Sequence, residues 1–234
     1  MEDEGIIFIM QTLQKCTNLK SLNLNLSFTS MEQKDLDNIA ESIGKLEKLN
    51  FLDLNLRSDI TNPDGNRKLQ QFRFFFFISL CLCLGLQKLA SISTLLIDLR
   101  ENWVDVEGLK YIGISLEESQ NINELELNLE SNKIGKEGIK SIAQGIQACI
   151  NITYLSLNLR NKLQNQAAKS IGAIFSQCLS IKKASLHLEY KNQQFNQFKL
   201  NKLSVDNQIN EVEKQNLEEI LLQKCQKLKE LIIF

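Results

Sequence analysis

Histidine is almost absent from this sequence, and so are the signature motifs of enzymes. Its single histidine, His187, excludes metal sites built from several histidines and leaves one candidate base for a Ser or Cys nucleophile. This residue lies between Ser185 and Glu189 on the polar side of an expected strand, where a solvated surface role is favoured. The chain contains neither a GxxxxGK(S/T) phosphate loop nor the kinase catalytic signatures. We therefore expect no catalytic activity, no cofactor and no metal site.

An excess of charge of one sign is missing too. The 27 Lys and Arg residues nearly balance 28 Asp and Glu residues, so the electrostatic footprint of a protein that binds nucleic acid or anionic membranes is absent. The N-terminus, Met1-Glu2-Asp3-Glu4, is acidic where a secretory signal needs positive charge. We expect a cytoplasmic protein whose partner is another protein. The sequence gives no signal for an oligomeric state.

What the sequence does contain is a repeated phrase of alternating apolar and polar residues. The phrase LKSLNLNL, which begins at Leu19, returns 30 residues later as LNFLDLNL at Leu49. Alternation with a period of two predicts a short strand with one buried face. Further copies begin at Ile92, Ile122, Ile152 and Ile181, and weaker copies at Leu200 and Leu228, which makes about eight in all.

Between the copies, the apolar spacing changes to three and four. Ile139, Ile142 and Ile146 place one apolar stripe on an amphipathic helix. Because neither the strand nor the helix can bury its apolar face alone, successive units should stack, with their strands in one parallel sheet. The same stripe recurs in segments that begin at Gly5, Leu36, Gly108 and Ala168.

These residues resemble a known family of repeats. The segment 125–138, LELNLESNKIGKEG, followed by an amphipathic helix, is similar to the ribonuclease-inhibitor type of leucine-rich repeat, and 95–109 is a second good copy. The resemblance implies an α/β solenoid in the shape of a horseshoe, with a parallel sheet on the concave side and helices on the convex side. The repeat is about two residues longer than is usual in the family. The Asn of the family is replaced by Thr29, Asp59 and Lys162 in other copies.

We expect residues 1–234 to form a single array with two irregular segments. Deleting the apolar segment 73–85 restores the period, so this segment is interpreted as an insertion. Its apolar run is shorter than the roughly 18 to 20 residues of a membrane helix. A translated, unspliced short intron and an over-hydrophobic helix on the convex side both fit it. Residues 189–199 lack a helical stripe and are expected to form an irregular loop or hairpin. Because the chain opens at the helix of a repeat and ends inside a strand, we expect it to be a fragment.

The six cysteines favour packing over chemistry. Equivalent positions in a solenoid lie about one repeat apart and face the core, where a reduced cysteine acts as a small apolar residue. Cys81 and Cys83 lie in the insertion and lack the paired spacing of a zinc site. The other four each lie three residues before the first apolar residue of a repeat phrase: Cys16, Cys149, Cys178 and Cys225.

The polar residues between the buried leucines should point to the concave side. One position in each repeat is expected to form a row along the sheet, and we favour an amide ladder that bonds from strand to strand and holds the register. Specific recognition of a ligand is the alternative. The row consists of Asn25, Asn55, Asp98, Asn128, Asn158 and His187.

The positions beside this row vary much more, as recognition requires. Because Tyr, Phe and Arg are enriched at interface hot spots, we predict that the partner contacts Phe51, Arg57, Arg100, Tyr154 and Arg160. The predicted function is a protein-binding scaffold without catalytic activity. Two alternatives stay open: an activator of a small GTPase, because one branch of the resembling repeats has that function, and the substrate-binding arm of a larger enzyme such as a kinase or a ubiquitin ligase.

Overall fold

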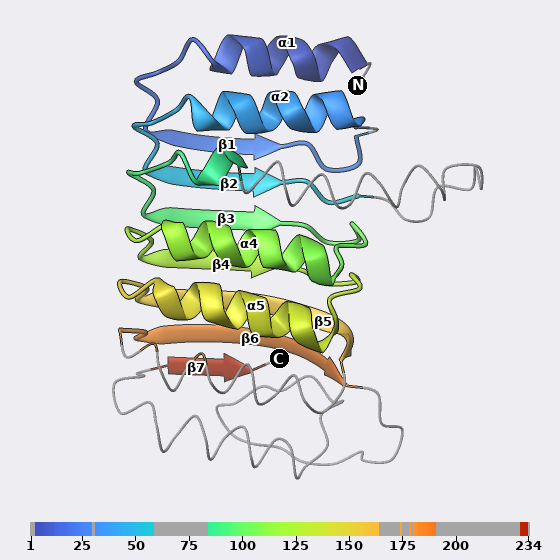
Figure 1. Cartoon of the computed structure of the whole chain (residues 1–234), viewed down its shortest axis with the longest axis vertical. Coiled ribbons are helices and arrows are strands. Elements are labelled where there is room, and N and C mark those ends of the chain that lie inside the picture. The colour runs from blue at the N-terminus through green and yellow to red at the C-terminus, as the bar shows by residue number, and fades with distance from the viewer. Residues whose placement is uncertain are drawn as a thin grey trace, which may run out of the picture.

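Strands and helices alternate along the chain in the computed structural model, as the two periodicities predict (Figure 1). The structure describes residues 3–29, 31–58, 84–163, 174, 178, 180–190 and 230–233. The elements are α1 (Asp3–Leu13), β1 (Ser21–Asn25), α2 (Gln33–Gly44), β2 (Phe51–Asn55), β3 (Thr94–Asp98), α4 (Val106–Glu118), β4 (Glu124–Asn128), α5 (Gly135–Ala148), β5 (Tyr154–Leu163), β6 (Lys183–Tyr190) and β7 (Glu230–Ile233).

The seven strands form one parallel sheet in sequence order. Each strand pairs with the next without a change of register between the repeat phrases, so the first central leucine of every copy lies beside its equivalent. This alignment confirms that the repeated phrase is a strand and that successive copies stack. The stacked residues are Leu22, Leu52, Leu95, Leu125, Leu155 and Ala184.

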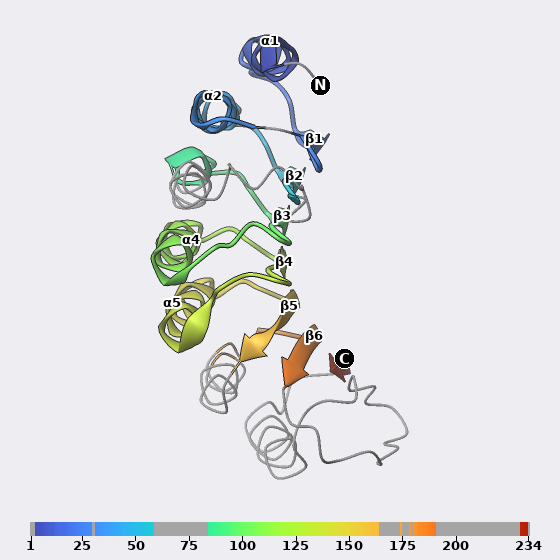
Figure 2. The same cartoon turned by 90° about the vertical axis from the view of Figure 1, so that its right-hand side faces the viewer.

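All described helices lie on one side of the sheet (Figure 2). The strand leucines point toward them, and Leu52, Leu54 and Leu56 have no exposed surface. The helices contribute the predicted stripe, since Ile142 and Ile146 are at most 2% exposed. In the side view the strands follow a shallow arc with the helices on its outer side, and no described helix covers the opposite face of the sheet. We call this opposite side the open face.

The side chain of Asn132 ends the repeat phrase that begins at β4. Its Nδ2 donates to the carbonyl oxygens of Leu129 (2.9 Å) and Leu99 (2.8 Å). Its Oδ1 accepts the backbone N–H groups of Asn102 (3.1 Å) and Val104 (2.8 Å) from the preceding repeat. One amide therefore satisfies polar backbone groups of two neighbouring loops, which explains why this residue type recurs after the strand.

Where another residue replaces asparagine at this position, the hydrogen bonding after the strand differs. Thr29 keeps part of the pattern, because its hydroxyl donates to the carbonyl oxygen of Leu26 (2.6 Å). Lys162 has no acceptor atom in its side chain and cannot receive the N–H groups of a preceding loop. Here the strand does not end: β5 continues to Leu163, which pairs with Tyr190 of β6.

Two pairs of neighbouring helices approach so closely that a glycine is needed at the contact. A Cβ on Gly145 of α5 would lie 2.4 Å from the carbonyl oxygen and 2.9 Å from the Cα of Gly113 in α4. A Cβ on Gly85, in the helical residues 84–86, would lie 3.0 Å from the carbonyl oxygen of Ala40 in α2. Gly145 and Gly85 occupy equivalent positions of the repeat, and so do Gly113 and Ala40. The two pairs of helices therefore pack against each other in the same way.

β6 pairs directly with β7, in the register Lys183 with Glu230, so no strand from residues 191–229 lies between them. The weak copy at Leu200 lies outside the described residues. The greater part of the expected helix at 168–178, of 73–85 and of 189–199 lies outside the described residues.

The cysteines separate into buried and exposed thiols. Cys149 and Cys178 are buried in the core, as expected, and their thiols donate to the carbonyl oxygens of Leu116 (3.0 Å) and Ile146 (3.6 Å) in the preceding repeat. The prediction was wrong for Cys16, which is exposed. No described repeat precedes α1, so Cys16 has no counterpart of the Leu116 carbonyl group and of the apolar cover that the preceding repeat gives Cys149. Cys81, Cys83 and Cys225 lie outside the described residues.

Alkylation of the native protein should distinguish these thiols. Burial raises the pKa of the Cys149 thiol to about 12, and the thiolate is the nucleophile, so Cys149 should stay protonated and unreactive at pH 8. We expect iodoacetamide to modify Cys16 at least about a hundredfold faster than Cys149, as read by peptide mass spectrometry. Denaturant should equalise the two rates. Equal rates in the native protein would contradict the described core.

Candidate functional site

The open face is a regular frame with side chains in straight rows. Strand pairing places Asn25, Asn55, Asp98, Asn128 and Asn158 in one row, followed by His187, as predicted. A second row holds Phe51, Thr94, Glu124 and Tyr154. Neighbouring members of a row are separated by the strand spacing of about 4.8 Å.

The hydrogen bonds of the asparagine row differ from the predicted ladder. The Oδ1 atoms of Asn25, Asn55 and Asn158 accept the N–H of the residue two positions later on the same strand, at 3.0, 3.0 and 3.2 Å. Among the described residues, none of these amides bonds to another member of the row. Each of these side chains satisfies an N–H of its own strand, two residues farther on, which is the local bonding that Asn and Asp favour in turns. Register is therefore held by the backbone pairing and the leucines.

The predicted contact residues fall into two groups on the open face. Phe51 and Tyr154 are half-buried, lie in one row and are three strands apart, which is about 14 Å. Arg57, Arg100 and Arg160 directly follow the buried leucine that ends each repeat phrase, so they line the edge where the strands end. The structure thus places all five on one side of the sheet but does not bring the aromatic and basic groups into one cluster.

Two of these arginines are held by carboxylates. Arg57 donates through Nε (3.1 Å) and Nη2 (2.5 Å) to Oε1 of Glu101 in the next repeat, and its guanidinium lies 5.1 Å from the ring centre of Phe28. Arg100 binds both carboxylate oxygens of Asp98, at 2.6 to 3.0 Å. The hydrogen bonds that Arg100 donates to Asp98 raise the pKa of Arg100, which is charged in either case. These ion pairs orient the guanidinium groups and leave little uncompensated positive charge at the edge.

Sequence reasoning missed the aromatic residues at this edge. Phe28 is 59% exposed, and the ammonium of Lys133 lies 3.6 Å from the ring centre of Trp103. Phe28, Glu101 and Trp103 have φ of 58°, 59° and 55°, a left-handed conformation that is uncommon for residues with side chains. The sequence signal that could have indicated these residues is a large apolar residue in a loop, outside the strand and helix patterns. Trp103, the only tryptophan of the chain, is the clearest case.

Tyr154 sits among acidic groups near the middle of the open face. Partial burial, the charge of Glu126 and a hydrogen bond to its carboxylate all raise the pKa of Tyr154, with a further contribution from the charge of Glu124. Both carboxylates belong to β4, the strand beside Tyr154, and neither is in an ion pair with a described residue. The phenol therefore stays protonated and acts as a donor to Glu126.

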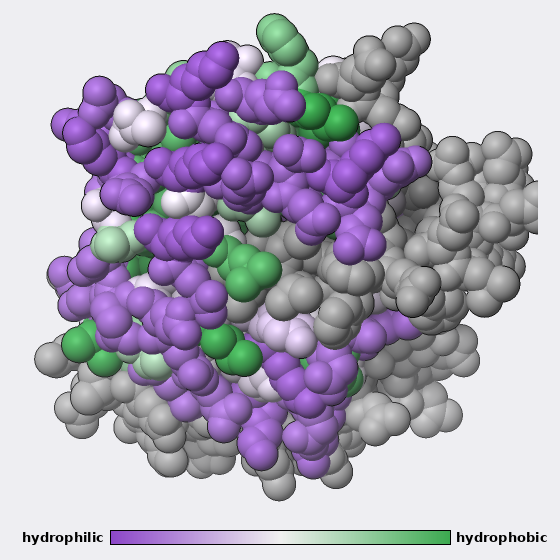
Figure 3. All heavy atoms as spheres, turned by 45° about the horizontal axis from the view of Figure 1, so that its top comes forward, coloured by the Kyte–Doolittle hydropathy of each residue, from purple (hydrophilic) through white to green (hydrophobic). Residues whose placement is uncertain are grey.

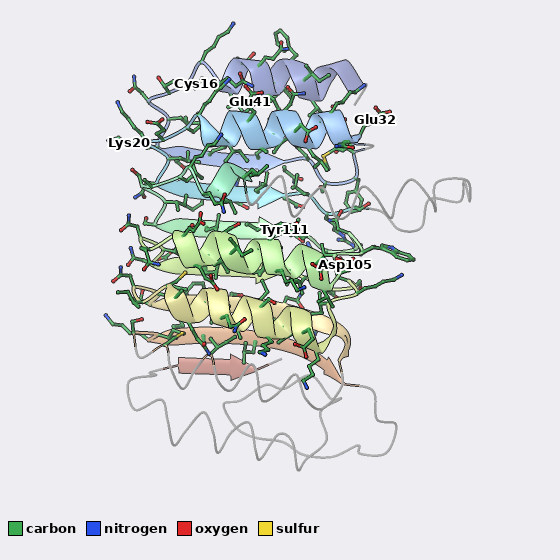
Figure 4. The ribbon with its side chains drawn as sticks, viewed as in Figure 1. Cys16, Lys20, Glu32, Glu41, Asp105 and Tyr111 are labelled. Atoms are coloured by element: carbon green, nitrogen blue, oxygen red, sulfur yellow. The ribbon has the colours of Figure 1, made fainter. Side chains whose placement is uncertain are left out.

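The N-terminal ends of α4 and α2, at the same edge, are capped by carboxylates of this chain. Asp105 precedes α4 and accepts the N–H of Gly108 (2.9 Å), and Asp35 in the first turn of α2 accepts the N–H of Glu32 (2.7 Å). Figure 4 shows Asp105 and Glu32 at the edge where the strands end, while Cys16 lies at the other edge. Within the described ranges, no group of three or more His, Cys, Asp or Glu side chains is placed to hold a metal ion, and no helix has both the length and the apolar character to cross a bilayer.

Comparisons with known proteins give a fold neighbour and no family. No protein-family model matches the chain, and no curated protein matches it. Among solved structures it is similar to the leiomodin-1 actin-binding site 2 (ABS2), with 12% sequence identity and a TM-score of 0.45 over 92% of this chain and 86% of that one. At this identity and TM-score the likeness carries no argument about function.

Proposed function

We propose that the chain is a cytoplasmic, non-catalytic protein-binding scaffold, built as a leucine-rich-repeat array of the ribonuclease-inhibitor type. In this proposal the array is a horseshoe, the open face is its concave side, and the partner docks there. The observation that carries the proposal is the contrast between the two faces of one sheet. On the covered face the buried positions of β2 to β5 repeat as leucine or isoleucine, whereas on the open face the positions beside the asparagine row change from strand to strand.

The surface on the helix side is the less suitable docking surface, which supports the open face as the binding side. In Figure 3 the described surface over the helices is mostly hydrophilic, and its apolar residues are scattered. Ile114 and Ile150 are exposed there as separate residues, which is ordinary for a soluble surface. On the open face Phe51 and Tyr154 are half-buried on a rigid frame, so ordering them at an interface costs little conformational entropy.

We assign contact roles to Phe51, Tyr154, Arg57, Arg100 and Arg160. The aromatic residues would supply buried area near the centre, and the arginines would supply oriented donors at the edge. The alternative functions have less support in the described residues. A GTPase activator would need a basic group that reaches the nucleotide, and both Arg57 and Arg100 are engaged by carboxylates of this chain. No described feature bears on a larger enzyme.

The proposal is tested with paired substitutions on the two sides of the sheet. A photo-crosslinking residue at Leu96 on the open face should capture a protein partner, whereas the same residue at Ile114 of α4 should not. Tyr154→Ala combined with Arg160→Ala should then weaken the affinity for that partner by at least about tenfold, since two hot-spot side chains are removed.

The matched control removes a tyrosine and a basic side chain from the helix side. Tyr111→Ala with Lys110→Ala changes a tyrosine and a cation on α4, where Figure 4 shows Tyr111, and should leave the affinity within about twofold. Calorimetry with the captured partner measures both variants. An unchanged affinity in the open-face variant, or equal losses in both, would move the binding site to the helix side or the loops.

A further inference from the structure

The centre of the open face holds two carboxylates that form no ion pair with a described residue. Glu124 and Glu126 lie two residues apart on β4 and so point to the same side of the sheet. Across the strand pairs, Glu124 has Thr94 and Tyr154 beside it, and Glu126 lies between Leu96 and Ser156, so no adjacent residue is a cation. The first cation in the row is Lys183, on the far side of Tyr154.

The acidic groups at the strand ends behave differently. Asp98 binds Arg100, and Glu101 binds Arg57, so each of those carboxylates has a cation of this chain against it. Asp53, one strand beyond Leu96, again lacks a cation, and its carboxylate receives only the amide of Asn23 (2.6 Å). Arginines of this chain therefore balance the carboxylates of Asp98 and Glu101 at the strand ends. The carboxylates of Asp53, Glu124 and Glu126 form no such pair with a described residue.

An aromatic ring lies beside these carboxylates. Tyr154 is the strand partner of Glu124, and Glu126 lies two residues farther along the same neighbouring strand, so the ring lies on the strand beside both carboxylates. A face of an aromatic ring attracts an ammonium or guanidinium group, and two adjacent carboxylates attract it more strongly. Leu96 supplies a half-buried apolar surface on the other side of Glu126, against which the stem of a long basic side chain can pack.

We propose that this centre, formed by Glu124, Glu126, Tyr154 and Leu96, takes a lysine or arginine side chain of the protein partner. The inference rests on the proposed function, because it names the chemistry of the segment that docks on the open face. The negative charge that attracts a basic segment repels the phosphates of a nucleic acid, so the partner class is a protein with an exposed basic segment.

Hexalysine peptide is the probe for this inference, used with the full chain at low salt. Titration followed by amide chemical shifts should perturb residues of β3, β4 and β5 on the open face. Glu124→Gln with Glu126→Gln should weaken hexalysine binding about tenfold, and Tyr154→Leu about threefold. The matched control, Glu117→Gln with Glu118→Gln, removes the same charge from exposed residues at the end of α4 and should change the affinity by less than about twofold.

Equal weakening in the two double variants would reduce the effect to net charge and overturn the inference, as would shift changes confined to other elements. The partner captured from Leu96 separates the two proposals. If its affinity is unchanged in the Glu124→Gln, Glu126→Gln variant, the basic-segment inference fails while the scaffold function stands. If capture occurs from Ile114 and not from Leu96, the scaffold function with its open-face site fails.

Discussion

Replacing Asn132 by alanine is expected to lower the free energy of unfolding by about 4 kcal/mol, because backbone groups of two repeats lose their partners at once. The amide accepts the N–H groups of Asn102 and Val104 and donates to the carbonyl oxygens of Leu99 and Leu129. Alanine offers neither donor nor acceptor. Urea denaturation monitored by circular dichroism measures the loss.

The control is Asn123→Ala, at an exposed position before β4 whose amide donates only to Asn121, and it should cost less than about 0.5 kcal/mol. Hydrogen exchange adds a local readout, since the amides of Asn102 and Val104 should exchange faster in Asn132→Ala than in the control. Similar stability in the two variants would show that the amide does not join the repeats.

Gly145→Ala is expected to destabilise the protein by about 2 to 3 kcal/mol, although alanine is the better helix former. The added methyl group would lie 2.4 Å from the carbonyl oxygen of Gly113, so α4 and α5 must move apart. Backbone cannot rotate away as a side chain can. Thermal and urea unfolding of the variant measure the effect.

Gln144→Ala is the control for this substitution, because residue 144 is exposed on the same helix and its propensity differs little from that of alanine. Its stability should stay within about 0.5 kcal/mol of the parent protein. A Gly145→Ala variant that is more stable than the parent would mean that the propensity gain is unopposed and that the helices are not in close contact.

The layered arrangement could be predicted because its signal is repeated. One copy of alternating leucines has many possible meanings, but copies at a fixed spacing with a helical stripe between them can bury both apolar faces only by stacking. The parallel register of Leu22, Leu52 and Leu95 follows from that requirement. The direct pairing of β6 with β7 could not be predicted, because it depends on 191–229, where the periodic signal fades.

The local bonding at the strand ends could not be predicted from residue type alone. A row of asparagines is compatible both with a ladder between strands and with a turn at the end of each strand. The structure has the second, since the acceptor of Asn55 faces the N–H of Arg57 at 3.0 Å. The exposure of Cys16 likewise depends on what precedes its repeat in space, which the spacing of cysteines does not contain.

For the candidate site, the sequence predicted that the proposed contact residues lie on the open face, but it did not predict their ion pairs. Side-chain alternation is enough to bring Phe51 and Tyr154 to the open face. The ion pair of Arg57 with Glu101 depends on the left-handed backbone at Glu101, which carries the carboxylate back toward the neighbouring repeat. Whether these residues bind a partner remains our proposal.

The boundary of the apolar insertion is the remaining sequence interpretation. Gly85 lies at the repeat position of Gly145 and packs against Ala40 as Gly145 packs against Gly113. Excision of 73–85 would place Phe72 at this contact, whereas excision of 72–84 has the same length and keeps Gly85. We therefore propose the insertion with its boundary moved by one residue.

The central claim is that the copies form one continuous parallel sheet. Spin labels attached through unnatural amino acids at Asn25 and Asn158 test it directly, because these residues lie in one row on strands β1 and β5. Four strand spacings predict a single narrow distance of about 19 Å between the two backbone positions. A broad distribution, or a distance beyond about 35 Å, would contradict the stacking of these repeats into one sheet.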